Sequence, residues 1–317
     1  LEELEPGSYW VRETKQAPGH ALDSTVYPVE VRSDETTRVN GQSVSDIPQS
    51  DPVGMLVGKV DADTNEGEPE GDATLEGALF TVRYYAGDYA DAASAEASGA
   101  PARTWVFETD ADGFAYLADE YKHSGDPLYY QTNGDASIPL GTVLIQETRA
   151  PQGYNLDDGH GGDPKVFCVR ITPDGAVGES VYTYNSPQVP DTVKRGDFRL
   201  VKEVPVEIYD SPSGDMPQEV VRVLVPGVKF ELYNDSESAV LSPETGKLVE
   251  PGNRVCTITV DENGLATTKD DNADVNGWSK PRNWTGALAY GTYRVHEVIS
   301  QDVADAFKAK WGKTLLP

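Results

Sequence analysis

The chain has 317 residues, which is enough for two or three domains. It carries 53 acidic and 26 basic residues, a net charge of -27, whereas phosphate binding relies on clustered lysine and arginine. Nucleic acid and anionic membrane surfaces are therefore poor partners, and no run of residues approaches the apolar length of a membrane span. Many glycines, prolines and tyrosines, with short runs rich in Val, Thr and Tyr, predict an all-β fold.

The first strand-like segment, PGSYWVRET, places a glutamate on an apolar face. Side chains alternate between the two faces of a strand, so Tyr9, Val11 and Glu13 share one face. A later strand-like run, SVSDIPQ, ends near Asp46. No lysine-bearing opening strand precedes these runs, so residues 1–50 are predicted to be the C-terminal part of a domain.

Residues 51–190 contain a complete set of elements. MLVGKVDADT places Lys59 in an apolar row, and EGALFTVRYY, DADGFAYL and GTVLIQETR follow it. In the last of these, Glu147 shares a face with two apolar residues. SVYTYNSPQ closes the set near Asn185, and its tail NSPQ aligns with the earlier DIPQ. The small-residue run ADAASAEASGAPA predicts a mobile loop.

The same order of elements begins again in residues 191–317. FRLVKEVPVE contains Lys202, PGVKFELYN and DENGLATT follow, and GTYRVHEV contains Glu297 on an apolar face. No closing strand follows, so we interpret this region as the N-terminal part of a third domain, ending in a short amphipathic helix, QDVADAFKAKWGK. We expect the incomplete end repeats to be partly disordered or paired with another chain. The proline-containing segments PQSDP and PQVPDTVKRGD are predicted to be linkers.

Other signals are weaker. Cys168 and Cys256 lie in strand-like runs of different repeats and are predicted to be free, buried thiols. DADTNEG has carboxylates at a spacing suited to calcium, but Glu66 stands where a calcium loop needs glycine, so a solvated acidic loop is favoured. The RGD triplet of KRGDFRL leads directly into a strand and is not expected to bind integrins. No metal or cofactor is predicted, because the histidines have no ligand spacing.

A lysine, a glutamate and an asparagine or aspartate thus occupy core faces. One interpretation is a buried ion pair with a hydrogen-bonded amide, which adds little stability. The other is chemical, because burial lowers the pKa of a lysine towards the nucleophilic amine and raises that of a glutamate. An amine held against a side-chain carbonyl can attack it while the glutamate relays the proton. The product is an isopeptide, formed with loss of ammonia from Asn or of water from Asp.

QETRAPQGYNLD and RETKQAPGHALD resemble the E-x-x-A-P-x-G-Y signature of CnaB-type (SpaA-like) domains, the repeats of Gram-positive surface adhesins and sortase-assembled pilins. The GALF and GVKF elements and the lysine strand are similar to the same family. The chain departs from the pattern at His20, which stands in place of tyrosine, and at VISQDVADAF, which replaces APxGY in the last repeat. The resemblance implies tandem prealbumin-like, reversed immunoglobulin-like β-sandwiches.

The resemblance also implies site residues. A CnaB-type domain commonly carries an autocatalytic isopeptide between its first and last strands, promoted by a buried glutamate. Carried onto this chain, the bond joins Lys59 to Asn185, with Glu147 as its catalyst. The equivalents in the partial repeats are Lys202, Glu297, Glu13 and Asp46.

The role implied by the resemblance is structural. The chain is expected to be a stalk or shaft segment of a cell-wall-anchored surface protein or pilin of a Gram-positive bacterium, with neighbouring domains of that protein as its partners. It turns over no substrate beyond the single bond-forming event. The alternative is an adhesin module that binds a host or matrix protein through long loops at residues 86–103 and 122–136.

Overall fold

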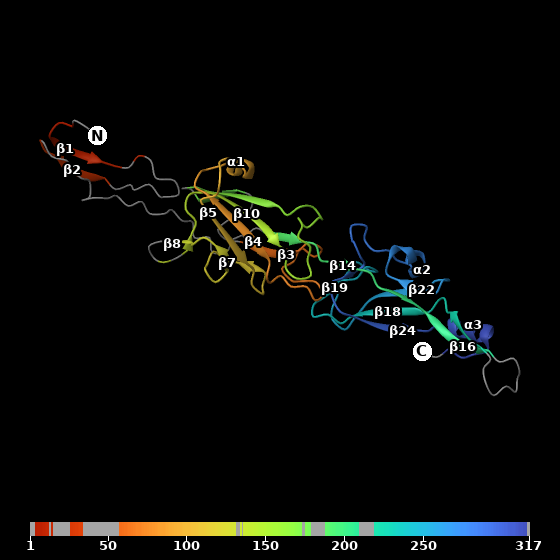
Figure 1. Ribbon diagram of the computed structural model, residues 1–317. Helices are drawn as coiled ribbons and strands as arrows, with labels where there is room; N and C mark the ends of the chain where they lie inside the picture. The colour runs from red at the N-terminus through yellow and green to blue at the C-terminus, as the bar shows by residue number, and fades with distance from the viewer. Residues whose placement is uncertain are drawn as a thin grey trace. The chain divides into compact units, whose positions relative to one another are not determined.

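The computed structural model describes residues 4–12, 14, 26–33, 57–130, 134, 136–172, 175–178, 188–208 and 219–315 (Figure 1). The chain divides into two compact units. Unit 1 comprises Leu1–Val60, Leu75–Pro151 and Leu156–Asp191, and unit 2 comprises Asp61–Thr74, Gln152–Asn155 and Thr192–Pro317. Most elements are strands, which confirms the predicted all-β class. The predicted domain division at residues 50 and 190 stays a prediction.

Two sheets of unit 1 form a sandwich. The larger sheet has the strand order β12-β11-β10-β4-β5-β7, and the smaller has the order β13-β3-β6. The larger sheet consists of β4 (Leu79–Tyr85), β5 (Arg103–Glu108), β7 (Lys122–Gly125), β10 (Gly141–Arg149), β11 (Val166–Thr172) and β12 (Gly175–Gly178). The smaller consists of β3 (Val57–Asp61), β6 (Phe114–Ala115) and β13 (Gln188–Asp191). Short pairs join β8 (Tyr129–Tyr130) to β9 (Ala136–Ser137) and β1 (Gly7–Val11) to β2 (Tyr27–Val31).

The core of unit 1 lies between these two sheets. Val57 and Val189 of the smaller sheet belong to the same buried cluster as Phe80, Trp105 and Val143 of the larger. Each of these side chains is at most 5% exposed. Burial of this apolar area, at about 25 cal/mol per Å², is the main force that holds the sheets together.

The small-residue run of unit 1 is a helix, and the prediction of a mobile loop is wrong there. Helix α1 (Ala92–Ala97) begins at Asp91, whose side chain accepts a hydrogen bond from the backbone N–H of Ser94. Alanine, the most frequent residue of this helix, has the highest helix propensity. The aspartate accepts a hydrogen bond from one of the backbone N–H groups that have no partner in the first turn of a helix. Ala95 is fully buried in a second cluster with Leu144 of β10. Tertiary packing therefore stabilises this helix in addition to the helix propensity of its residues.

Unit 2 is built from shorter sheets. Three strands have the order β21-β18-β24, and the remaining strands pair as β14-β23, β15-β22, β16-β17 and β19-β20. The three-stranded sheet consists of β18 (Lys229–Asn234), β21 (Arg254–Thr259) and β24 (Tyr293–Val298). The paired strands are β14 (Arg195–Gly196), β15 (Arg199–Val201), β16 (Glu203–Ile208), β17 (Glu219–Leu224), β19 (Val240–Leu241), β20 (Leu248–Val249), β22 (Leu265–Thr267) and β23 (Leu288–Ala289).

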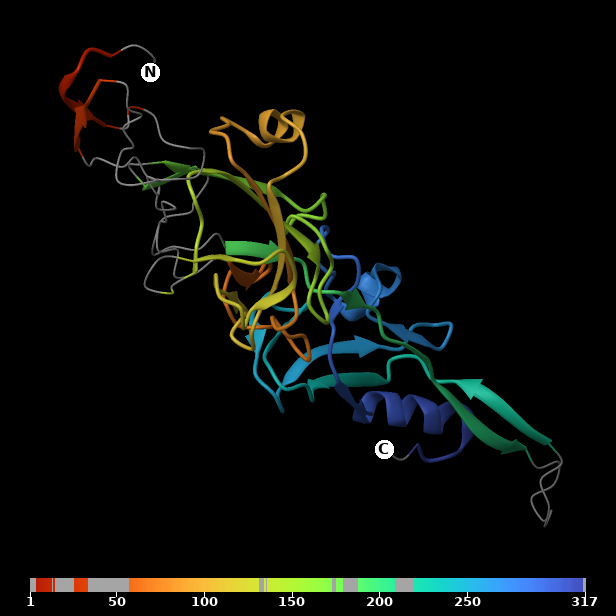
Figure 2. The ribbon, with the colours of Figure 1, turned by 60° about the vertical axis from the view of Figure 1, so that its left-hand side comes forward.

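The predicted amphipathic helix is confirmed as α3 (Gln301–Trp311) in unit 2. Ser300 caps its first turn and buried Phe307 anchors it, and Figure 2 shows it beside the hairpin formed by β16 and β17. Two shorter helices, η1 (Asp270–Asn272) and α2 (Ala273–Asn276), lie earlier in the unit. Among the described residues, no helix is both long and apolar enough to span a membrane. Cys168 and Cys256 are free thiols, as predicted, and Cys256 is buried, but Cys168 is only half-buried, so the prediction of burial is wrong there.

Candidate functional site

The opening strand of unit 1 carries a buried lysine. All five residues of β3 are buried, and the backbone N–H of Lys59 donates to Gly113 O at 2.8 Å, which extends the pairing of β3 with β6. Gly113 has φ +78°, a conformation that glycine adopts without strain, at the end of the turn that begins with Asp110. The Lys59 side chain is thereby fixed facing the core and is 0% exposed.

Glu147 reaches the lysine from the facing sheet. It lies on β10, where it pairs with Phe80 of β4. The register of this strand pairing shifts between Glu147 and Arg149. Its Oε2 accepts a hydrogen bond from Lys59 Nζ at 2.8 Å. The Lys59 ammonium also lies 6.0 Å from the centre of the Phe80 ring. The structure therefore brings together two of the predicted site residues, which are 88 positions apart in the sequence.

The third member of the site is Asp191, at the end of β13. Its Oδ2 lies 2.8 Å from Lys59 Nζ, and its side chain is 0% exposed. Strand β13 is the edge neighbour of β3 in the smaller sheet. Val189 and Val193, two residues before and after Asp191, are also buried, so the three residues alternate as inward-facing positions of an extended chain. We refer to Lys59, Glu147 and Asp191 as the unit 1 triad.

The unit 1 triad confines three ionisable groups in a dry core. Burial, reinforced by the charge of Asp191, raises the pKa of Glu147 to about 8. Burial also raises the pKa of Asp191 above its ordinary value. With Glu147 protonated, a lysine ammonium and an aspartate carboxylate leave the site neutral. Transfer of one proton from Lys59 to Asp191 then gives an amine and a carboxylic acid without changing the net charge. Such a transfer creates the two reactants of an amide condensation.

The structure does not describe three of the other predicted site residues. Asn185, Glu13 and Asp46 lie outside the described residues, so their roles stay predictions. Sequence reasoning missed Asp191, because PQVPDTVKRGD contains two prolines and was interpreted as a linker. The alternation of Val189, Asp191 and Val193 was the signal that could have identified it.

Unit 2 holds a second lysine–glutamate pair with the same backbone framework. The N–H of Lys202, between β15 and β16, donates to Gly264 O at 2.8 Å, as Lys59 does to Gly113. Glu297 of β24 lies opposite Phe230 of β18, as Glu147 lies opposite Phe80. Lys202 Nζ and Glu297 Oε1 are 2.5 Å apart. The side chains of this pair are 19% and 28% exposed, although the contacting Oε1 of Glu297 is itself buried.

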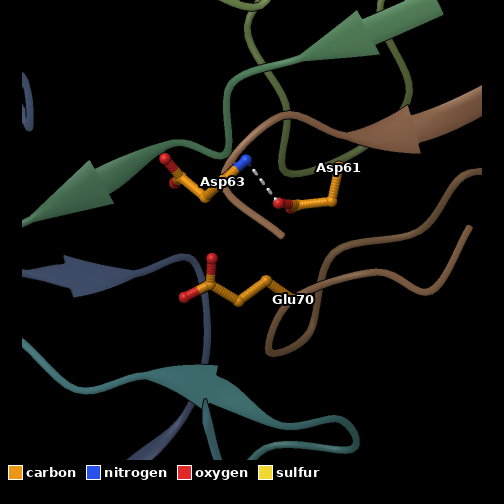
Figure 3. A group of neighbouring side chains, drawn as sticks. All are labelled: Asp61, Asp63 and Glu70. Atoms are coloured by element: carbon orange, nitrogen blue, oxygen red, sulfur yellow. Dashed lines mark hydrogen bonds between the residues drawn. The ribbon is translucent and has the colours of Figure 1, made fainter. Parts of the chain in front are cut away.

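Three further acidic residues gather in unit 2. Asp61, Asp63 and Glu70 offer oxygens within 4.8 Å of one another (Figure 3). The guanidinium of Arg195 lies 2.7 Å from Asp63 and 2.8 Å from Glu70, and it stacks 3.5 Å from the centre of the Trp284 ring. Arg195 therefore supplies the positive charge of this group, which we call the Arg195 network.

The Arg195 network corrects one prediction and bears on another. Asp61 is fully buried and accepts a hydrogen bond from Tyr154 Oη at 2.8 Å, so the solvated-loop prediction is wrong at this residue. Arg195 and Asp197 are the outer residues of the RGD triplet. The Arg195 side chain is only 2% exposed, and Asp197 accepts a hydrogen bond from Thr268. This arrangement does not present an integrin-binding loop tip.

Comparison with known proteins gives a family match at the N-terminus. Residues 1–44 match the family model "SpaA: Prealbumin-like fold domain". The match confirms, for this segment, the resemblance to CnaB-type (SpaA-like) domains, and the strand-rich units agree with tandem all-β sandwiches. A search of curated proteins finds no match.

Three solved structures are similar to this chain. A Bacillus anthracis TIE protein is 20% identical with a TM-score of 0.43, and the match covers 94% of this chain and 37% of that one. A streptococcal ancillary pilin is 19% identical with a TM-score of 0.24, covering 94% of this chain and 67% of the pilin. GBS52, a minor pilin of Streptococcus agalactiae, is 13% identical with a TM-score of 0.22, covering 77% of this chain and 82% of the pilin. The chain thus spans about a third of the TIE protein's length.

Proposed function

We propose that the chain is a structural segment of a bacterial surface protein or pilus, in which unit 1 is closed by an isopeptide between Lys59 and Asp191. The observation that carries this proposal is the buried unit 1 triad, in which Lys59 Nζ lies 2.8 Å from both a glutamate and an aspartate. Location at the surface of a Gram-positive cell, with neighbouring domains of the same protein as partners, belongs to this proposal. The SpaA match at residues 1–44 supports it.

The proposed step is a condensation. The Lys59 amine attacks the Asp191 carboxyl carbon, a C–N bond forms, and the C–O bond to the hydroxyl breaks. Glu147, which is protonated at the start, donates its proton to the departing oxygen and takes the proton that the amine loses, so one water molecule leaves and Glu147 is regenerated. The fixed 2.8 Å approach replaces a bimolecular encounter. Because the product remains in place, each chain performs the step once.

The bond would give unit 1 mechanical strength. It closes a loop from β3 to β13, which would stabilise unit 1 by about 5 kcal/mol on the chain-entropy scale used for disulfides. Tension applied at Lys59 and Asp191 would pass through the covalent bond and bypass the residues between them. This property suits a stalk, which must transmit force without unfolding.

The test of the proposed chemistry is the intact mass of the denatured protein. The parent should be lighter than its sequence mass by one water, and Glu147→Gln, which keeps the size of the side chain but loses its acid, should have the full sequence mass. Loss of ammonia would instead indicate reaction at the predicted Asn185. A parent of full mass would leave the unit 1 triad as a buried ion-pair network and would overturn the proposed bond.

The test of the mechanical role is extension of single molecules held at both ends. Without the bond, unfolding of the segment between Lys59 and Asp191 releases on the order of 450 Å of chain. The parent should release none of this length, and Glu147→Gln should release all of it. Binding to a matrix protein through residues 86–103 and 122–136, the alternative role, stays a prediction.

A further inference from the structure

The turn that joins β21 to β22 in unit 2 contains an asparagine followed by a glycine. Its sequence is DENG, residues 261–264. In an Asn-Gly pair the backbone nitrogen of the glycine can attack the side-chain carbonyl of the asparagine, because glycine has no side chain to obstruct a close approach. Such a pair can therefore lose ammonia without an enzyme. Unit 2 contains a second pair, Asn276-Gly277, with which the first can be compared.

The side chain of Asn263 is free to take part in this reaction. Asn263 is exposed, and its backbone N–H donates to Asp261 Oδ1 at 2.9 Å. Its side-chain amide makes no hydrogen bond to any residue that the structure describes. The attacking nitrogen, that of Gly264, donates to Asp261 O at 3.0 Å. Opening of this one hydrogen bond therefore brings the two reacting groups together.

Asn276 also precedes a glycine, but its side chain is fixed. It is half-buried, its Oδ1 accepts from the N–H of Thr259 at 2.8 Å, and its Nδ2 donates to Thr267 O at 2.8 Å. Strands β21 and β22 thus hold both polar atoms of the amide. The N–H of the following glycine is bonded as well, to Ala273 O at 2.9 Å. The two pairs therefore differ in the freedom of the asparagine side chain.

We propose that Asn263 is a site of spontaneous deamidation and that Asn276 is protected from it. The backbone nitrogen of Gly264 loses its proton to hydroxide and attacks Cγ of Asn263, and a C–N bond forms. The bond from Cγ to the side-chain nitrogen breaks, and this nitrogen takes a proton from water and leaves as ammonia. The product is a cyclic imide. A water molecule then adds to either of its carbonyl carbons and opens the ring to aspartate or isoaspartate.

The aspartate product fits the turn. Unit 1 contains the equivalent turn DADG, residues 110–113, in which Asp112 stands in place of the asparagine. The N–H of Asp112 donates to Asp110 Oδ1 at 3.1 Å, which is the bond that Asn263 makes in unit 2. Aspartate at position 263 should therefore leave the turn intact.

The isoaspartate product weakens the support of Lys202. Isoaspartate carries the main chain through its side chain, which adds one methylene to the backbone of the turn. Gly264 O accepts from the N–H of Lys202 at 2.8 Å, and a Cβ on Gly264 would lie only 2.5 Å from Leu224 Cδ2. A longer backbone displaces Gly264 from this close-packed position. Isoaspartate should therefore loosen β15, which pairs with β22.

The test follows both pairs in the complete folded chain during incubation at mildly alkaline pH, where the backbone nitrogen loses its proton more readily. Trypsin cleaves after Arg254, Lys269 and Arg282 and so places the two asparagines in separate peptides. Mass spectrometry detects the exchange of an amide for an acid, and chromatography separates aspartyl from isoaspartyl peptides. A sample unfolded in urea gives the rate of each pair without the constraints of the fold.

The unfolded sample should react at similar rates at both asparagines. In the folded chain Asn263 should react faster than Asn276 by about tenfold or more, because the hydrogen bonds of the Asn276 amide must break first. Equal rates at the two positions in the folded chain would overturn the inference. So would the absence of reaction at Asn263 in the folded chain while the unfolded sample reacts there.

Two variants sharpen the result. Asn263→Gln keeps the amide but moves its carbonyl one methylene away, and it should not react in this peptide over the same period. Asn263→Asp reproduces the aspartate product, so β15 should exchange hydrogen faster in the isoaspartate fraction of the parent than in this variant. Equal exchange in the two would overturn the effect on Lys202.

The same reaction bears on the mass test of unit 1, since the cyclic imide lacks one ammonia, as an isopeptide at Asn185 would. Hydroxylamine distinguishes them, because it cleaves the chain at an imide and leaves an isopeptide intact. Deamidation at Asn263 does not depend on the proposed bond, so Glu147→Gln should show it at the rate of the parent. A loss of the reaction in Glu147→Gln would contradict its assignment to the turn.

Discussion

Units 1 and 2 place a lysine and a glutamate on the same framework but in different surroundings. The opening lysine donates its N–H to a glycine with φ +78° in both units, Gly113 in one and Gly264 in the other. The glutamate faces a phenylalanine in both. In unit 1 the lysine side chain is 0% exposed and contacts Asp191 as well as Glu147, whereas in unit 2 the Lys202 side chain is 19% exposed and, among the described residues, pairs with Glu297.

The difference shows what a closing strand contributes. The lysine–glutamate contact forms in both units, so it depends only on the opening strand and the glutamate strand. Burial of the pair and the approach of an aspartate occur in unit 1, where β13 is present. In the proposed chemistry, reactivity therefore depends on the last strand, which would supply both the acyl group and the buried environment that shifts pKa values.

The largest expected effect is that of Lys59→Ala. This change removes the proposed bond, about 5 kcal/mol of loop closure, and leaves Glu147 and Asp191 buried without a cation. Unit 1 should lose most of its stability while unit 2 keeps its own. Hydrogen exchange resolved by peptide measures both units in one sample. Unchanged protection of β4 and β10 in the variant would contradict the account of unit 1.

A smaller effect is expected from Arg195→Ala in the Arg195 network. The change leaves Asp63 and Glu70 without their cation, and loss of one partner of a buried ion pair costs about 3–5 kcal/mol. Hydrogen exchange should accelerate in β14 and β19 of unit 2, because Glu70 also accepts from the N–H of Leu241. Arg195→Lys, the control, keeps the charge and should recover part of the loss. An equal loss in both variants would mean that packing on Trp284 matters more than charge.

Unit 2 should also respond to pH through Glu70. Burial raises its pKa from 4.5 to about 7, against the opposing effect of Arg195. The folded unit therefore binds this proton more tightly than the unfolded chain does, so its stabilising effect is fully present below pH 4.5 and is lost as the pH rises to about 7. Denaturation midpoints at pH 5 and pH 8 measure the difference, which Glu70→Gln should reduce. A parent and variant with the same pH dependence would refute this assignment.

The smallest effect is expected from Lys202→Ala, the counterpart of the largest. The ion pair with Glu297 is partly exposed, and such pairs contribute about 0–1 kcal/mol. Thermal unfolding of unit 2 in the chain alone should change by no more than this. A loss as large as that of Lys59→Ala would mean that Lys202 is already bonded or buried in solution, and the contrast between the units would fail.

Much of this comparison could be predicted from the sequence, because it depends on short-range pattern. Period-two alternation placed Lys59 and Glu147 on inward faces, and the structure brings them together. The same alternation identified Lys202 and Glu297. The helix α3 followed from its apolar stripe. These features could be predicted because a strand or helix with one buried face carries its apolar residues at a regular local spacing.

The parts that failed depend on long-range pairing. Asp191 stands next to Pro190, and a proline normally argues against a strand, but β13 is an edge strand in which a missing N–H is tolerated. Which closing segment meets β3 is decided by the whole sandwich, and spacing along the chain does not contain that information. The helix α1 was missed for a similar reason, since the contact of Ala95 with Leu144 lies almost fifty residues away in sequence.

The most direct test of the central claim is to map the cross-link in the parent protein. The denatured chain is digested with a protease, and fragments are sequenced by tandem mass spectrometry. The account predicts a branched fragment that joins Lys59 to Asp191 with loss of one water, and a linear fragment that contains unmodified Lys202. Recovery of Lys59 and Asp191 only in linear fragments would contradict the claim that the closing strand makes unit 1 reactive.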